Sequence, residues 1–455
     1  KPSLSFSMMQ ILIILTRDRL KEEKTNRIRE VKLEIKNTVS EVFKKCGIPE
    51  NKIDSSLKVS IWYKKGVYYL KITCEKKQNK KYKEKLFLSY DYFSEEFMEK
   101  GIYIGGEEVE NFESEFANFV KSKNVIGAGS GTAALHLIFL ALELTDGDEV
   151  ICPTFTFAAT ANSIALTGAK PVFVDIGQAT YNIDVTKIEE AITGRTKAIV
   201  PVHLYGHLAD MPAMLKIAKK HNLYVIEDAA HAMGAEYKGK KIGSLGNLTC
   251  FSMFPTKNIT TGEGGLISLN DEQKYHRLLR LRLHGMSKDG WKRYAKEGSW
   301  YYEVHEAGYK YNLPDINAAI GIAQLKKLNT LNRKREILVD HYLKRLGGFE
   351  GIKTVKLLPK VKSSWHIFPI WIDSKKAGIT RNRLITELFE RNIGTSVHFI
   401  PVHFQPFYHN RYHYHRGDFP ITEKVFEGIL SLPLFPDMTE QDVDDVVDAL
   451  KDSMR

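Results

Sequence analysis

Residues 225–231 read Val-Ile-Glu-Asp-Ala-Ala-His, so an apolar strand ends in two carboxylates. Comparable short apolar segments recur along the chain and alternate with amphipathic segments such as Asp210–His221. This alternation predicts the α/β class, with a mostly parallel sheet covered by helices on both faces. The expected strands are Glu149–Ile151, Pro171–Val174, Ala198–Pro201 and Tyr224–Ile226.

Helical periodicity continues on both sides of these strands. It predicts helices over Glu107–Val120, Thr132–Leu144 and from Leu313 to about Leu346. The end of the chain mixes a strand with helices, as a smaller α+β domain does, at Trp365–Ile372, Arg381–Arg391 and Glu440–Lys451. We therefore expect a large α/β domain over residues 87–346 and a small C-terminal α+β domain over residues 347–455.

Residues 1–86 differ from the rest because they carry the whole excess of positive charge. They hold 22 of the 66 Lys and Arg residues but only 10 of the 55 Asp and Glu residues. The remainder is nearly neutral, so its charge indicates no nucleic-acid partner. The pattern predicts a small α+β extension, with a helix over Arg19–Lys45 and strands Lys58–Tyr63 and Val67–Thr73, followed by a lysine-rich linker. Its role stays open between packing or solubility and binding an acidic partner or membrane surface.

Composition also excludes several classes of protein. The four cysteines stand far apart, which favours a reduced, cytoplasmic compartment and forms neither a zinc motif nor a thiol-redox motif. No apolar run approaches the about 20 residues that a transmembrane helix needs, so no transmembrane segment is expected. The histidines near the end of the chain lack a familiar ligand spacing, so no metal site is predicted there: His409, His413 and His415.

Lys257 lies among small and polar residues, between a strand and the pair Gly264-Gly265. A loop lysine is ordinarily solvated, whereas a Schiff-base lysine must lose its proton readily, which a desolvated or cationic environment favours. Ser252, five residues earlier, carries a hydroxyl that could bind a cofactor phosphate or simply end the strand.

Two further segments allow a functional and an ordinary interpretation. Gly129–His136 places glycines before an apolar helix, where free N–H groups can bind an anion, although such a turn is more often a tight connection. Asp228 could cap a helix. In an enzyme that uses pyridoxal 5'-phosphate (PLP), an aspartate pairs with the pyridine nitrogen and keeps the ring electron-poor.

In order and spacing, these motifs resemble the DegT–StrS family of PLP-dependent nucleotide-sugar aminotransferases, over roughly residues 88–450. The resemblance implies a fold-type I PLP-dependent transferase, with a mostly parallel central sheet flanked by helices. The extension of about 86 residues is not part of the family pattern. The matching segments are Tyr103–Gly106 with Phe112-Glu113, Gly147–Phe157, Glu227–His231, the segment around Lys257, Gly308–Asp315, His398–His403 and Leu430–Pro433.

The resemblance also implies roles for individual residues. Lys257 would carry PLP as a Schiff base and move protons, and Asp228 would pair with the pyridinium nitrogen. The remaining roles are phosphate binding by Gly131, Thr132 and Ser252, stacking on the cofactor by Phe157, contact near its 3-oxygen by His231, phosphate binding in the neighbouring subunit by Asn312, and substrate contacts by His398 and His403.

The implied reaction moves an amino group from L-glutamate, through PLP, to a keto carbon of a nucleotide-diphospho-sugar, with C4 preferred over C3. Because Asn312 would reach the cofactor phosphate in the neighbouring subunit, the resemblance also implies a homodimer. A dehydratase of the same family is the first alternative, but those relatives replace the lysine with histidine. A non-catalytic binding or regulatory protein on the PLP fold is the second, and the intact Lys257, Asp228 and Ser252 argue against it. A nucleotide-binding Rossmann protein is the third alternative, but the sequence has no GxGxxG motif directly after a strand.

Overall fold

The computed structural model describes residues 103–245, 247–287 and 301–454, together with the backbone of three strands before residue 89. The chain divides into two compact units, Lys1–Ile102 and Tyr103–Arg455. The predicted domain limits at residues 86 and 346 stay predictions. None of the helices in these described parts is long and apolar enough to cross a membrane.

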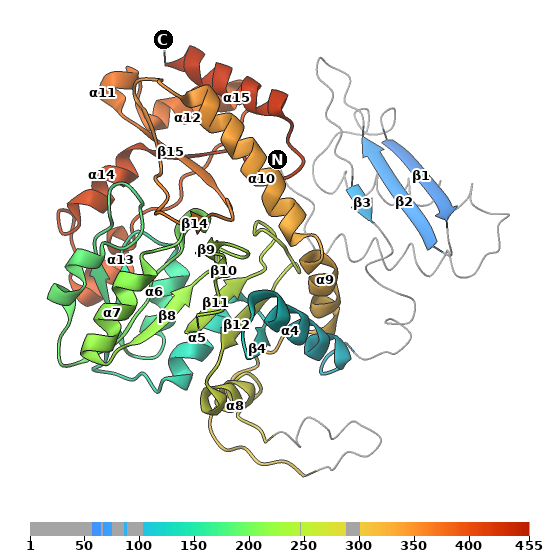
Figure 1. Ribbon diagram of the computed structural model, residues 1–455, viewed down its shortest axis with the longest axis vertical. Helices are drawn as coiled ribbons and strands as arrows, with labels where there is room; N and C mark the ends of the chain where they lie inside the picture. The colour runs from blue at the N-terminus through green and yellow to red at the C-terminus, as the bar shows by residue number, and fades with distance from the viewer. Residues whose placement is uncertain are drawn as a thin grey trace. The chain divides into compact units, whose positions relative to one another are not determined.

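Within the first unit, the expected hairpin is present (Figure 1). Strands β1 (Leu57–Lys64) and β2 (Val67–Cys74) pair antiparallel, and Lys64 pairs with Val67. A third strand, β3 (Leu86–Leu88), was not predicted and pairs antiparallel with β2. The helix predicted over residues 19–45 and the lysine-rich linker lie outside the described residues.

A seven-stranded sheet forms the centre of the second unit, and its strand order is β4-β12-β11-β8-β7-β5-β6. Only β12 runs against the other strands, because it pairs antiparallel with both of its neighbours. The mostly parallel α/β sheet expected from the sequence is therefore confirmed. The strand bounds are β4 Asn124–Ala128, β5 Glu149–Pro153, β6 Lys170–Val174, β7 Thr196–Ile199, β8 Tyr224–Asp228, β11 Leu248–Ser252 and β12 Gly265–Leu269.

Helices cover both faces of this sheet because successive strand residues point to opposite sides. In β8, Ile226 packs into a core with α5, α6 and α8, whereas Val225 packs into another with α7. Helices α4 and α9 cover the remainder of that second face. The bounds are α4 Glu107–Val120, α5 Gly131–Ala141, α6 Ala158–Ala165, α7 Met211–His221, α8 Glu272–Leu281 and α9 Asp315–Leu325.

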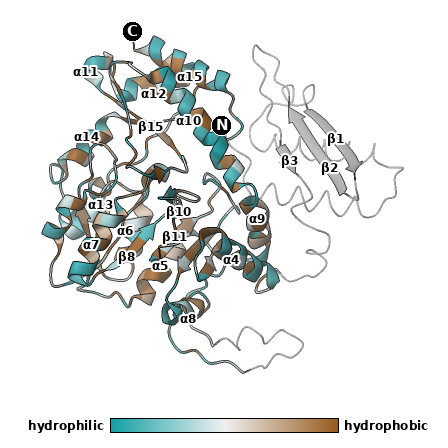
Figure 2. Ribbon diagram, in the orientation of Figure 1, coloured by the Kyte–Doolittle hydropathy of each residue, from teal (hydrophilic) through white to brown (hydrophobic). Residues whose placement is uncertain are grey.

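Local signals explain where several of these helices begin and end. The side chain of Ser130 caps α5 by accepting from the N–H of Ala133, and Asp210 caps α7 in the same way. Asn222 ends α7 in a left-handed conformation. Figure 2 shows that α4 and α15 (Glu440–Ser453) mix hydrophilic and hydrophobic residues, as helices with one buried face do.

The structure has two helices where the sequence predicted one. The segment expected to run from Leu313 to about Leu346 breaks at Lys326-Lys327 into α9 and α10 (Leu328–Leu346). A buried apolar stripe continues through both helices, with Leu325 in one and Leu328 in the other, so periodicity alone did not reveal the break. From α9, α10 leads toward the C-terminal helices (Figure 1).

The C-terminal part is built on a three-stranded antiparallel sheet, β13-β15-β16. Residues of β15, such as Phe368, share a core with α10, α12 and α15 and also with Phe155 and Tyr205 from the first part of the unit. The strands are β13 Ile352–Thr354, β15 Phe368–Ile372 and β16 Ile429–Leu432, and the helices are α11 Ser374–Ala377, α12 Arg381–Glu390, α13 Pro406–Tyr412, α14 Pro420–Gly428 and α15. A second small sheet joins β9 Glu236–Tyr237, β10 Lys240–Lys241 and β14 Val361–Lys362.

Candidate active site

Asp228 is the last residue of β8, so its carboxylate lies at the carboxyl end of the central sheet, and the residue is only 5% exposed. The Thr160 hydroxyl donates to Oδ2 at 2.7 Å, and the N–H of Ala230 donates to Oδ1 at 3.1 Å. The Thr156 hydroxyl lies 2.9 Å from that of Thr160. A carboxylate can accept about four hydrogen bonds, so this anchored group still has capacity for another partner.

Lys257 lies in the loop between β11 and β12, and its N–H donates to the carbonyl of Phe254 at 2.9 Å. Burial lowers the pKa of its ammonium to about 8, even though the charges of Asp228 and Cys250 act in the opposite direction. About one tenth of this lysine is therefore a free amine at pH 7, far more than for a solvated lysine. This property fits a nucleophilic lysine rather than the solvated loop lysine that was the ordinary alternative.

Three imidazoles belong to the same cluster as Lys257: the buried His231 and His366 and the half-buried His398. Burial lowers the pKa of all three rings, and the nearby Lys257 ammonium lowers each of them further. For His398 the pKa falls to about 4. The ring centroids of His231 and His366 are 4.4 Å apart. These rings are therefore neutral at physiological pH and add no positive charge around the amine.

Tyr205 sets the geometry of two of these imidazoles. Its N–H donates to Nδ1 of His231 at 3.2 Å, which leaves the proton of the neutral ring on Nε2. Its hydroxyl donates to the carbonyl oxygen of His398. The imidazole of His398 is held by a 2.9 Å hydrogen bond between Nδ1 and the hydroxyl of Ser431. Both rings are thus oriented by the protein itself.

Gly131 and Ser252 meet at the start of α5. A Cβ atom added to Gly131 would lie 2.8 Å from the Cβ of Ser252, so only glycine fits at this contact. Because Ser130 already accepts from the N–H groups of Ala133 and Ala134, the remaining N–H groups of this first turn belong to Gly131 and Thr132. Together with the Ser252 hydroxyl they form a cradle suited to an anion.

Phe157 precedes α6 and is 59% exposed, so the alternative of an ordinary core phenylalanine does not hold. Its ring centroid lies 5.5 Å from that of Phe399, which in turn lies 5.8 Å from the ring of His231. An exposed aromatic ring at the edge of this cluster can stack on a planar ligand.

Asn312 lies beside the same turn, because it forms a β-bridge with Ala128 at the end of β4. Its side-chain oxygen accepts a hydrogen bond from Lys310. The structure contains one chain, and the reach of Asn312 toward a neighbouring subunit stays a prediction.

His403 is not part of the cluster around Lys257. The residue is 1% exposed; its Nδ1 lies 2.7 Å from the hydroxyl of Thr154 and its Nε2 lies 3.2 Å from a carboxylate oxygen of Glu423. Since both ring nitrogens are engaged inside the protein, the geometry favours a structural role for His403 and not the substrate contact expected from the sequence.

The loop that carries Lys257 is tied to later parts of the chain through its neighbour. Asn258 is buried, and its amide donates to the side chain of Asn332 at 2.7 Å and to the carbonyl of Ser364 at 2.8 Å. Asn332 lies on α10 and donates to the carbonyl of Met233 at 3.0 Å. The position of the amine therefore depends on contacts with three separate segments.

Three members of the site were missed in the sequence: Thr160, Tyr205 and His366. Their roles come from tertiary contacts at separations of 26 residues or more, as between Thr160 and Asp228 or between Tyr205 and His231. Tyr205 also has a positive φ of 62°, which no local sequence pattern predicts. Across the described ranges, no group of three or more His, Cys, Asp or Glu side chains could hold a metal ion.

Comparison with known proteins identifies this arrangement. The model of the DegT/DnrJ/EryC1/StrS aminotransferase family matches residues 92–451. The spore coat polysaccharide biosynthesis protein SpsC of Bacillus subtilis is 46% identical over 361 residues, which cover 79% of this chain and 93% of SpsC.

Solved structures agree with this match. DesV of S. venezuelae is 33% identical with a TM-score of 0.73, and the alignment covers 79% of this chain and 92% of DesV. Spr1654 of Streptococcus pneumoniae, whose structure is described in a PMP form, is 31% identical with a TM-score of 0.74 over 79% of this chain and 94% of that protein. The chain therefore belongs to the DegT/DnrJ/EryC1/StrS family of PLP-dependent sugar aminotransferases.

Proposed function

We propose that this protein moves an amino group from L-glutamate to a keto carbon, preferentially C4, of a nucleotide-diphospho-sugar. The product would be an amino-deoxy sugar for a surface polysaccharide or glycoconjugate. The observation that carries the proposal is the half-buried Lys257, whose pKa is lowered by desolvation and which lies within electrostatic reach of the carboxylate of Asp228 at the end of β8. The polysaccharide role described for SpsC supports the sugar assignment.

The residues present fit the cofactor that the family uses. Lys257 would hold its aldehyde carbon, Asp228 would pair with its pyridine nitrogen, and Gly131, Thr132 and Ser252 would bind its phosphate. The close packing of Gly131 on Ser252 supports this assignment, because it brings the Ser252 hydroxyl beside the first N–H groups of α5. His231 would lie near the 3-oxygen and Phe157 would stack on the ring. Bound there, PLP supplies an electron sink for the carbanion that forms when a proton leaves carbon.

The protein's own contribution is proton transfer and orientation. The free Lys257 amine has a pKa of about 8, which is close to neutral pH and suits a group that both takes and gives a proton. Asp228 is held in place by Thr160 and by the N–H of Ala230. The neutral imidazoles of His231 and His398 offer hydrogen bonds without adding charge, and we propose that His398 contacts the substrate.

We further propose a cytoplasmic homodimer. Asn312, beside the start of α5, would reach the phosphate in the partner's site, so a complete site would need two chains. The buried cysteines Cys152 and Cys250 are free thiols, which is consistent with a reducing compartment.

The direct test is replacement of the amine. The Lys257→Ala variant should lose the near-visible absorbance of the lysine-bound cofactor, together with all transamination, because no other described group replaces the nucleophile. Absorbance before and after addition of glutamate, and mass spectrometry of keto-sugar nucleotides, would measure both effects. Lys326→Ala, at an exposed lysine, is the matched control and should behave as the wild type. Full turnover by Lys257→Ala would contradict the proposal.

A further inference from the structure

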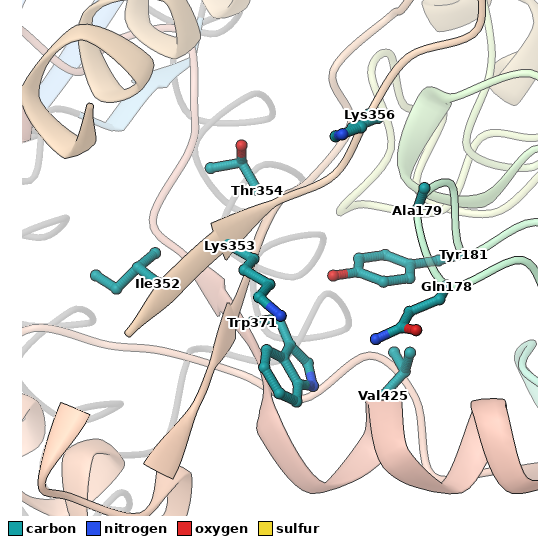
Figure 3. A pocket seen from close by; sticks show the side chains of 9 residues that line it. All are labelled: Gln178, Ala179, Tyr181, Ile352, Lys353, Thr354, Lys356, Trp371 and Val425. Atoms are coloured by element: carbon teal, nitrogen blue, oxygen red, sulfur yellow. The ribbon is translucent and has the colours of Figure 1, made fainter. Parts of the chain in front are cut away.

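A cavity of about 600 Å³ lies at one side of the second unit, between the loop after β6 and the C-terminal sheet (Figure 3). This volume falls within the range of small-molecule sites, about 300–1,000 Å³. None of the residues assigned above to the active site lines it. The lining residues are Gln178, Ala179, Tyr181, Ile352, Lys353, Thr354, Lys356, Trp371 and Val425.

Tyr181 supplies a hydroxyl group to this cavity. The residue is only 4% exposed, and Figure 3 shows its oxygen pointing into the cavity, on the side of Lys353 and Trp371. No residue in the described part of the chain forms a hydrogen bond with this hydroxyl. Tyr181 also has a positive φ of 58°, an unfavourable conformation for a tyrosine that the surroundings must stabilise. A buried phenol held in this way is available to a ligand.

Positive charge gathers at the same cavity. Lys353 places its ammonium 4.9 Å from the centroid of the Trp371 ring, so that charge is held at the cavity wall. Lys356 is tied to the opposite wall, because its N–H donates to the carbonyl of Ala179 at 2.9 Å. The lining includes these two lysines and no carboxylate. The cavity therefore favours an anionic ligand.

The remaining wall is suited to a planar, partly apolar group. The indole of Trp371 provides a flat apolar surface with Val425 beside it, and it is fixed by donating to the carbonyl of Lys424 at 3.1 Å. The amide of Gln178 offers both a donor and an acceptor, as the edge of a nucleobase requires. The cavity thus combines an aromatic, apolar wall for a flat ring, an amide for the polar edge of that ring, and two ammonium groups for an anionic part.

We propose that this cavity binds a nucleoside phosphate. Its base would lie along the apolar wall and be read by Gln178 and the Tyr181 hydroxyl, while Lys353 and Lys356 would bind the phosphates. The ligand could be a free nucleotide or the nucleotide end of the sugar substrate; only the second source rests on the proposed function.

The cavity is connected to the active site through two tyrosines. The rings of Tyr181 and Tyr205 meet edge to face with centroids 6.5 Å apart. Tyr205 in turn holds His231 and the carbonyl of His398. Occupancy of the cavity can therefore act on the imidazoles beside Lys257 through direct contacts.

The test is calorimetric titration of the cofactor-loaded protein with UDP, dTDP and GDP as probes. Lys353→Glu/Lys356→Glu should weaken binding at least about tenfold, because two phosphate-binding cations become repulsive anions. Both lysines are exposed, so the substitutions should not disturb folding. The matched control is Lys375→Glu/Lys376→Glu, which makes the same charge change on α11 outside the cavity and should alter binding less than about twofold.

Each outcome is decisive for the cavity. Undetectable binding of all three nucleotides at millimolar concentration, unchanged binding in Lys353→Glu/Lys356→Glu, or equal weakening in both double variants would overturn the proposal. A raised KM for the sugar nucleotide, with an unchanged response of the cofactor absorbance to glutamate, would assign the cavity to the substrate. An unchanged KM with weakened UDP binding would assign it to a free nucleotide. Binding of UDP by a protein that never takes up PLP would refute the proposed function alone.

Discussion

Two neighbouring carboxylates at the end of β8 have opposite surroundings. Glu227 is fully buried and accepts hydrogen bonds from His203, Asn247 and Thr249 at 3.0–3.1 Å. Asp228 points to the other face of the sheet and is held by Thr160 and one N–H group. The first carboxylate is held by three side chains of the protein, whereas the second, with two donors, keeps more capacity for a partner beside Lys257. Of two adjacent acidic residues, one can thus stabilise the fold while the other is left available for chemistry.

Within this pair of carboxylates, the larger effect on activity is expected from Asp228→Asn. This variant removes the negative charge and nearly preserves the shape, so the protein should fold while transamination falls by about a hundredfold or more, as when a preorganised electrostatic group is lost. Single-turnover absorbance changes with glutamate would measure the loss. Near-normal turnover by the folded variant would show that the carboxylate has no part in the reaction.

The adjacent substitution, Glu227→Gln, should give the reverse pattern. It leaves a buried amide where three donors converge, so the free energy of unfolding should fall by about 1–3 kcal/mol. The rate per folded molecule should stay close to that of the wild type. Denaturant unfolding and active-site titration separate the two quantities. Equal losses of activity in the two variants would remove the distinction between the carboxylates.

Thr160→Val removes one hydrogen bond to Asp228 and leaves its carboxylate in place. A hydrogen bond to a charged group contributes about 1.5–3 kcal/mol, so loss of the 2.7 Å contact should reduce the rate by about tenfold to a hundredfold. Thr156→Val is the matched control, because that hydroxyl reaches only Thr160 among the hydrogen bonds described and should have a smaller effect. Steady-state kinetics of both variants at saturating glutamate provides the comparison.

The smallest effect concerns pH. For a pKa of about 8, the free-amine fraction of Lys257 rises from about one tenth at pH 7 to about nine tenths at pH 9. Because the free amine is the nucleophile, cofactor uptake by the apoprotein should accelerate over this interval and level off above it. Stopped-flow absorbance after mixing with PLP would record the profile. A midpoint near 10 would mean that Lys257 is not desolvated in solution.

The sequence predicted those features that repeat locally or carry a distinctive motif. The helix Glu107–Val120 has the predicted bounds. Asp228 and Ser252 are the last residues of β8 and β11, and Lys257 lies in the loop between a strand and Gly264-Gly265, as predicted. Periodicity did not reveal the break between α9 and α10, since the apolar stripe runs through it.

Other features depend on contacts between distant residues, so no local pattern reports them. His366 joins the active-site cluster because its ring meets His231 across 135 positions of sequence. His403 was expected at the substrate from its motif, yet Thr154 and Glu423 hold both of its nitrogens. A histidine's type and motif therefore predict its chemistry less well than the groups that surround it.

The attachment of Asn258 has a consequence for engineering substrate preference. The side-chain amide of Asn258 donates hydrogen bonds both to α10 and to the segment that leads into the C-terminal sheet. Chimeras that exchange the C-terminal part with that of a relative keep the acceptor at Ser364, because it is a backbone carbonyl, but a crossover placed before α10 would replace the Asn332 side chain. Donor sequences should therefore be chosen to keep asparagine at 332 and the same backbone path at 364, so that a new specificity does not come with a displaced nucleophile.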